Sequence, residues 1–88
     1  MSPSPRYEVF IKASAEREMN ALPANVFSRV TRMILTLESD PRRRGCRKLR
    51  GADGYRLRVG DYRIIYLIND GTRIVEVIAV AHRREVYR

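Results

Sequence analysis

Hydrophobic residues follow two different periods along the chain, and together these periods predict an α+β fold. Residues 7–12 alternate between apolar and polar side chains, which is typical of a strand. The next segments repeat apolar residues at helical spacing, and the last part of the chain is rich in valine, isoleucine and tyrosine. The predicted segments after the first strand are helices over residues 14–22 and 24–38 and strands over residues 55–59, 62–68 and 73–81.

Helix-ending signals support this division. Ser14 is a favourable N-cap, and Pro23 separates the short first helix from the second. Asp40-Pro41 is a stop signal for the second helix. The buried stripe of the second helix is predicted to consist of Val26 or Phe27 with Val30, Ile34 and Leu37.

Short turns connect the later strands. Gly60-Asp61 and Asp70-Gly71 are turn signals of the kind found in tight hairpins. The predicted order is therefore strand, helical hairpin, and then a three-stranded antiparallel meander, with the helices packed on one sheet. We expect residues 1–88 to form a single domain, with residues 1–5 as a flexible lead.

Charge is distributed unevenly along this fold. The formal net charge is +8, and residues 1–41 contribute none of it, with five basic and five acidic side chains. Residues 42–88 carry thirteen basic and five acidic side chains, and all basic residues of the chain except Lys12 and Lys48 are arginine. Because the arginine fork matches phosphate oxygens, this asymmetry favours nucleic acid as the partner over a merely solvated basic face.

Composition excludes several other classes of function. Cys46 is the only cysteine, so the sequence predicts no internal disulfide and no cysteine-based zinc site, and it suits a reducing cytosol. The longest apolar run, residues 64–68, is too short to span a membrane, and residues 1–5 do not resemble a signal peptide. We expect a cytoplasmic protein that needs no cofactor.

The hairpin around Gly60-Asp61 carries the first candidate site. Alternation places Arg56 and Arg58 on one face of their strand, and a two-residue turn would set Arg58 opposite Arg63. Like charges opposite each other destabilise a sheet by up to about 1 kcal/mol, so a phosphate-binding role is a better explanation than structure alone. The alternative is that each arginine pairs with a nearby acid, namely Asp61, Glu76 or Glu85.

A second cluster closes the chain at residues 82–88. His82, the only histidine, is predicted to fall on the face of Arg58 and Arg63 if the strand keeps its alternation. Tyr87 could stack on a base. No spacing of histidine, cysteine and carboxylates indicates a metal site. The favoured chemistry is metal-free RNA cleavage, in which the ribose 2′-OH attacks the adjacent phosphorus and arginines hold the phosphate.

These residues resemble the RelE/ParE superfamily of toxins, and the RelE branch in particular. The matching stretches are residues 48–51, 55–66 and 82–87, and the resemblance extends over nearly the whole chain from Tyr7 onward. It implies a microbial-ribonuclease-like fold and cleavage of mRNA in the A site of the 70S ribosome. It also implies a RelB-like antitoxin that forms a hetero-oligomer with the toxin.

The resemblance also assigns roles to individual residues. It implies that Arg56 and Arg58 are basic residues of the site, that Arg63 binds the scissile phosphate, that Arg83 is a general acid or charge stabiliser, and that Tyr87 orients the substrate. Some relatives carry a lysine proposed as general base where this chain has arginine. The base is therefore open between a perturbed arginine, His82, and catalysis by orientation and charge alone.

The basic segment over residues 42–51 is predicted to contact ribosomal RNA, unless it is a solvated mobile loop. The predicted RNA-binding residues are Arg43, Arg44, Arg47, Lys48, Arg50 and Arg84. Two rival functions remain: a ParE-like inhibitor of DNA gyrase, and an RNA-binding module without catalytic activity.

Overall fold

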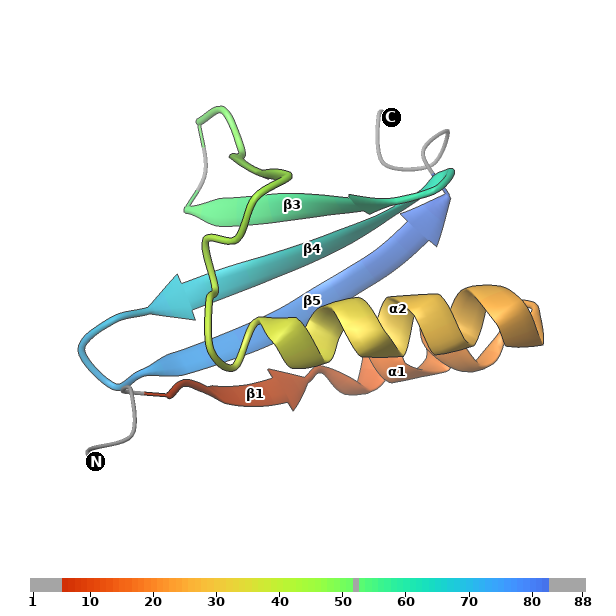
Figure 1. Ribbon diagram of the computed structural model, residues 1–88, viewed down its shortest axis with the longest axis horizontal. Helices are drawn as coiled ribbons and strands as arrows, with labels where there is room; N and C mark the ends of the chain where they lie inside the picture. The colour runs from red at the N-terminus through yellow and green to blue at the C-terminus, as the bar shows by residue number, and fades with distance from the viewer. Residues whose placement is uncertain (1–5, 52, 83–88) are drawn as a thin grey trace.

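Two helices lie on one face of the sheet (Figure 1). The sheet has five strands. The computed structural model describes residues 6–51 and 53–82. Its elements are β1 (Glu8–Ile11), α1 (Ala13–Asn20), α2 (Ala24–Thr36), β2 (Cys46–Lys48), β3 (Gly54–Val59), β4 (Tyr62–Asn69) and β5 (Ile74–His82). The α+β class, the helical hairpin and the meander β3–β4–β5 are confirmed.

The strand order is β1-β5-β4-β3-β2, and β1 is parallel to its neighbour β5, whereas the other pairs are antiparallel. The predicted antiparallel meander is confirmed, and the sheet as a whole is mixed because β1 is parallel to β5. β1 pairs with the last strand and not with a neighbour in sequence, so no tight turn fixes its direction. The segment predicted as a basic loop also contains a strand, β2, which pairs with β3.

The core lies between the helices and the sheet. The predicted stripe of α2 is confirmed at Val30, Ile34 and Leu37, which are at most 2% exposed. Of the two alternatives at the start of the stripe, Val26 packs against the core, whereas Phe27 remains 36% exposed. The fully buried side chains of the sheet are Leu57, Ile64, Tyr66, Val75 and Val77.

The prediction that Ser14 caps α1 is wrong. The helix begins at Ala13, and the preceding Lys12 has extended backbone angles and makes no side-chain capping bond. The Lys12 N–H donates to the Val77 carbonyl at 2.9 Å, so strand pairing continues up to the first helical residue. Ser14 is therefore the second residue of α1 and does not lie at the N-cap position.

A β-bulge in β5 changes which side chains face the core. Tyr66 is opposite Val77, whereas the preceding residue of β4, Ile65, is opposite Ala79, so Ile78 is an extra residue. The alternation of side chains therefore changes phase after Val77, as an inserted residue requires. Val80, which would otherwise face away from the helices, is instead only 2% exposed within the core.

A polar clasp joins four segments at one end of the sheet. Arg42 donates to both carboxylate oxygens of Asp70 at 3.0 and 2.8 Å, and its guanidinium lies 5.4 Å from the centre of the Tyr55 ring. The Tyr7 hydroxyl donates to the same carboxylate at 2.6 Å. Arg42 first, and Tyr7 second, lower the pKa of Asp70 to about 2.

We expect the clasp to make the stability of the fold depend on pH. Because the folded pKa of Asp70 lies below the ordinary value of 3.8, its stabilising effect is present above that value and is lost as the pH falls toward 2. Asp70→Asn should therefore lower the urea midpoint at pH 6, and the difference from wild type should disappear between about pH 4 and pH 2. In an Arg42→Gln background the same substitution should have a smaller effect, because only the Tyr7 hydroxyl still donates to Asp70. A difference between Asp70→Asn and wild type that does not change with pH would contradict this account.

Candidate functional site

The β3–β4 hairpin has the geometry that its sequence predicts. Val59 is opposite Tyr62, so Gly60 and Asp61 form a two-residue turn. Gly60 has a φ of 61°, whereas Asp61 is not in the positive-φ region, which is the arrangement of a II′ turn. This turn fixes the register of every pair in the hairpin.

The register brings four arginines together on the face of the sheet that the helices leave uncovered. Arg58 is directly opposite Arg63, which confirms the predicted pair, and Arg47 of β2 is directly opposite Arg56. Side chains opposite each other in an antiparallel ladder share a face, and residues two apart on a strand do as well. The two pairs therefore lie next to each other on the same face of the sheet, and each pair consists of two arginines.

A hollow of about 680 Å³ lies against these arginines. Its lining comes from α2, from the segment before β2, from the β3–β4 turn, and from strands β2, β3 and β4. The residues that line it are Met33, Arg44, Gly45, Arg47, Arg56, Leu57, Arg58, Gly60 and Arg63. The described lining offers positive charge and hydrogen-bond donors, and among these residues there is no carboxylate, imidazole or phenol.

The two central arginines of this hollow differ in exposure. Arg63 is only 8% exposed, so packing restricts the position of its guanidinium. Arg58 is exposed, and its Nε donates to the Gly60 carbonyl at 3.1 Å, which ties the side chain to the turn. A restricted guanidinium beside an accessible one suits a site that holds a phosphate in one orientation.

The alternative explanation, pairing of the arginines with nearby acids, receives no support from Asp61 or Glu76. Within residues 6–51 and 53–82 the one ion pair joins Arg42 to Asp70, in the clasp. Glu85, the third acid considered, lies outside the described residues.

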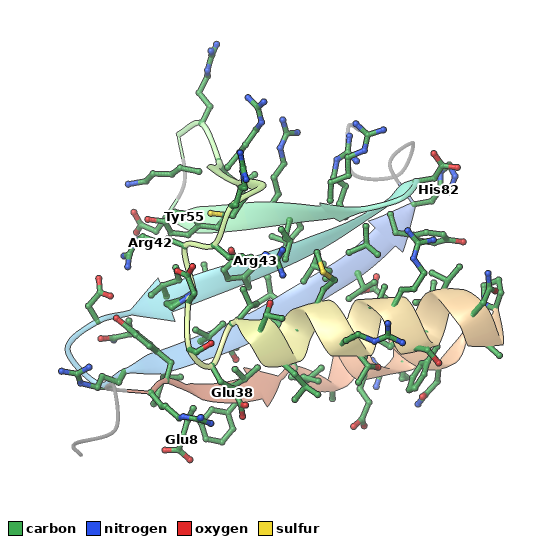
Figure 2. The ribbon with its side chains drawn as sticks, viewed as in Figure 1. Glu8, Glu38, Arg42, Arg43, Tyr55 and His82 are labelled. Atoms are coloured by element: carbon green, nitrogen blue, oxygen red, sulfur yellow. The ribbon has the colours of Figure 1, made fainter. Side chains whose placement is uncertain are left out.

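The predicted position of His82 is wrong. His82 is opposite Tyr62, and their rings meet edge to face at 5.3 Å, so His82 lies on the helix-covered face and not with Arg58 and Arg63. The bulge at Ile78 is the reason, because it reverses the alternation on which the prediction depended. His82 lies at the end of β5 far from the Arg42–Tyr55 clasp (Figure 2), beside Glu18 of α1 in a separate hollow.

The other predicted residues are distributed unevenly. Arg44 and Arg47 line the main hollow, and Lys48 and Arg50 line a neighbouring one of about 510 Å³. Arg43 lines neither, because its guanidinium turns toward α2 and donates to the Thr36 hydroxyl at 2.9 Å and to the Met33 sulfur at 3.4 Å. Arg83, Arg84 and Tyr87 lie outside the described residues.

Sequence reasoning missed two arginines of α2. Arg29 and Arg32 line a third hollow, of about 240 Å³, together with Arg58 and Gly60. Their spacing of three residues on a helix was the available signal, because it places both side chains on one flank of α2. They belong to the charge-balanced half of the chain, so the charge asymmetry pointed elsewhere.

The described residues contain neither a cluster of metal-binding side chains nor a membrane-spanning helix. No group of three or more histidine, cysteine, aspartate or glutamate side chains that could hold a metal ion occurs in residues 6–51 and 53–82. In the same part of the chain, no helix has the length and apolar character needed to cross a membrane.

Known proteins resemble this chain in sequence over almost its full length. The sequence model of the family described as "ParE toxin of type II toxin-antitoxin system, parDE" matches residues 9–87. Toxin RelE of Mycobacterium tuberculosis is 34% identical over 90 aligned positions, which cover 100% of this chain and 93% of that protein.

Solved structures resemble the fold. The toxin–antitoxin complex RelBE2 from Mycobacterium tuberculosis contains a chain that matches with a TM-score of 0.80 and 30% identity, over 89% of this chain and 99% of that one. The archaeal RelE–RelB complex from Pyrococcus horikoshii OT3 matches with the same TM-score and identity, over 88% of this chain and 94% of that one.

Proposed function

The chain belongs to the RelE/ParE family of type II toxin–antitoxin toxins, and on that basis we propose that it is a ribosome-dependent endoribonuclease. It would cleave mRNA in the ribosomal A site and so inhibit translation. The observation that carries this proposal is the arginine-lined hollow beside the paired residues Arg58 and Arg63.

In the proposed reaction the ribose 2′-OH attacks the adjacent phosphorus and the bond from phosphorus to the 5′-oxygen breaks, which gives a 2′,3′-cyclic phosphate and a 5′-hydroxyl. The proton that the 2′-OH loses is balanced by the proton that the leaving 5′-oxygen gains, through solvent or the site. Negative charge builds up on the phosphorus oxygens in the transition state, and guanidinium groups held in advance around that position stabilise it. Arg63 is the best placed to do so, because packing already restricts it. Arg56 and Arg58 would bind the same phosphate or its neighbours from the adjacent strand.

The general base is not His82 in this proposal. His82 lies on the other face of the sheet from the arginines, so it does not point toward the phosphate that they would hold. We propose instead that the enzyme orients the 2′-OH and neutralises charge, with Arg83 and Tyr87 completing the site. The ribosome would then supply the strand geometry that in-line attack requires.

A programmed-ribosome assay tests this function. We expect cleavage at one position in the A-site codon, without added metal beyond that which the ribosome needs, and no cleavage when the nucleotide before the scissile phosphate carries 2′-deoxyribose. Intact mRNA in the first case, or cleavage of the deoxy substrate, would contradict the proposed reaction.

A gyrase-inhibiting function is the second candidate, because the description of the matching family model names the ParE toxin. The sequence relative and both structural relatives cited above are instead RelE proteins or RelE-type complexes. A supercoiling assay with purified gyrase separates the two functions, and inhibition there together with intact mRNA on the ribosome would favour the ParE-like candidate.

We also propose a RelB-like antitoxin as the partner of this chain, in a hetero-oligomer, because both structural relatives cited above are toxin–antitoxin complexes. The site of action would be the cytoplasm, where ribosomes and mRNA occur.

A further inference from the structure

Three hollows at the β2–β3 side of the sheet are neighbours that share lining residues. The hollow around Lys48 and Arg50 shares Arg47 and Arg56 with the main hollow. The main hollow in turn shares Arg58, Gly60 and Met33 with the hollow on α2. Neighbouring hollows that share lining residues form one track, which leads from β2 across β3 to α2.

Charge along this track has a single sign. Its lining includes basic side chains from α2, β2, β3, β4 and two connecting segments, and among these described residues none is acidic. The hollow at the opposite end of β4 and β5 differs, because its lining includes Asp53 and Glu76 and is mostly apolar. The surface is thus divided by charge, and a flexible polyanion matches the track better than a compact anion does.

The α2 end of the track has a defined geometry. Arg29 and Arg32 are three residues apart on the helix, which places their side chains on the same flank. The terminal nitrogens of Arg29 lie 3.6 Å from the position that a Cβ atom on Gly60 would occupy, so this guanidinium rests against the hairpin turn. The turn that sets Arg58 opposite Arg63 therefore also positions Arg29.

We propose that Arg29 and Arg32 form a second phosphate-binding subsite, which holds single-stranded RNA on one side of the scissile phosphate. This proposal rests on the proposed function only for the identity of the substrate. The RNA backbone would run along the track, with the reacting phosphate in the main hollow and a neighbouring part of the strand on α2. Arginine contacts to phosphates give affinity without base preference, so this subsite would add length dependence and not sequence preference.

Binding of oligouridine measured against salt concentration tests the subsite. The wild-type chain, Arg29→Gln/Arg32→Gln and the matched control Arg6→Gln/Arg17→Gln would be titrated with 4- and 12-nucleotide RNA. Each phosphate contact to single-stranded RNA contributes about 0.7 to the slope of log K against log salt. We expect the α2 variant to lose about 1.4 from the slope with the 12-mer, which is about 25-fold in affinity at 0.1 M salt. With the 4-mer its loss should be much smaller.

The control removes the same two charges from exposed positions outside the track, and its slope should match wild type within error. An equal loss in the control, or an equal loss with both RNA lengths, would overturn the subsite. So would an α2 variant that binds RNA normally but loses affinity for an acidic antitoxin. Arg29→Lys/Arg32→Lys retains the charges and should recover most of the slope, which separates loss of contacts from misfolding. The assay measures RNA binding and not cleavage. It therefore tests the subsite even if the protein cleaves no RNA.

Discussion

Arg63→Gln is expected to lower the rate of site-specific mRNA cleavage on programmed ribosomes by about 10²- to 10³-fold, the effect of removing one preorganised donor from a developing oxyanion. Arg63 is 8% exposed and directly opposite Arg58, so its guanidinium is held at the hollow by packing before any substrate arrives. Because the negative charge that Arg63 is proposed to stabilise is larger in the transition state than in the bound substrate, kcat should fall more than KM rises.

Two comparisons make this result specific. Arg17→Gln removes an exposed arginine on α1 that lines none of the three hollows of the basic track, and it should leave cleavage within twofold of wild type. Arg63→Lys retains the charge but not the planar fork, so its rate should be intermediate. Thermal unfolding of each variant would show whether the fold survives. A folded Arg63→Gln enzyme that cleaves within threefold of wild type would remove Arg63 from the mechanism.

The arginine pairs were predictable because local chemistry determines them. A two-residue turn at Gly60-Asp61 fixes which residues of the two strands are opposite each other, and no distant contact is needed to establish that register. The stripe of α2 was predictable for the same reason, since helical spacing alone brings Val30, Ile34 and Leu37 together. Both predictions depended on contacts between residues close in sequence.

The misplacement of His82 shows where such reasoning fails. Nothing in the sequence of β5 marks Ile78 as an inserted residue, because valine, isoleucine and alanine suit either face of a half-buried strand. The bulge becomes visible only when β5 pairs with β4. Predictions that count alternation across several residues therefore lose their phase at a single undetected insertion, which is why His82 was placed on the wrong face.

Long-range pairing explains the remaining differences. β2 has only three residues and is recognisable only by its partner β3, and β1 is parallel to a strand more than sixty residues later in the chain. The α2 arginines join the basic track only because the helix packs beside the β3–β4 turn. These features depend on the assembled sheet, so the candidate site extends farther than the strand arginines from which it was predicted.

Tyr66→Ala is expected to lower the free energy of unfolding by about 3–5 kcal/mol, the usual range for removing a buried large aromatic side chain. The Tyr66 side chain is completely buried, and its ring stacks on Tyr55 at 5.9 Å. A domain of this length is expected to lie toward the low end of the usual 5–15 kcal/mol stability range, so most of its stability would be lost. Urea denaturation would measure the loss. Tyr55→Phe removes only a hydroxyl that accepts a solvent-exposed hydrogen bond from Arg42 Nε at 3.2 Å, so it should cost about 1 kcal/mol or less.

The Tyr66 hydroxyl connects this core position to the site. It donates to the Pro41 carbonyl at 2.8 Å, in the segment that leads from α2 to Arg44 and Arg47 of the hollow. Tyr66→Phe keeps the ring but leaves that carbonyl without its donor, which should cost about 1–2 kcal/mol. Because the segment would lose one of its attachments to the core, the folded Tyr66→Phe protein should also bind 12-nucleotide RNA more weakly than Tyr55→Phe does. Equal RNA affinity in the two folded variants would show that the hollow keeps its shape without this bond.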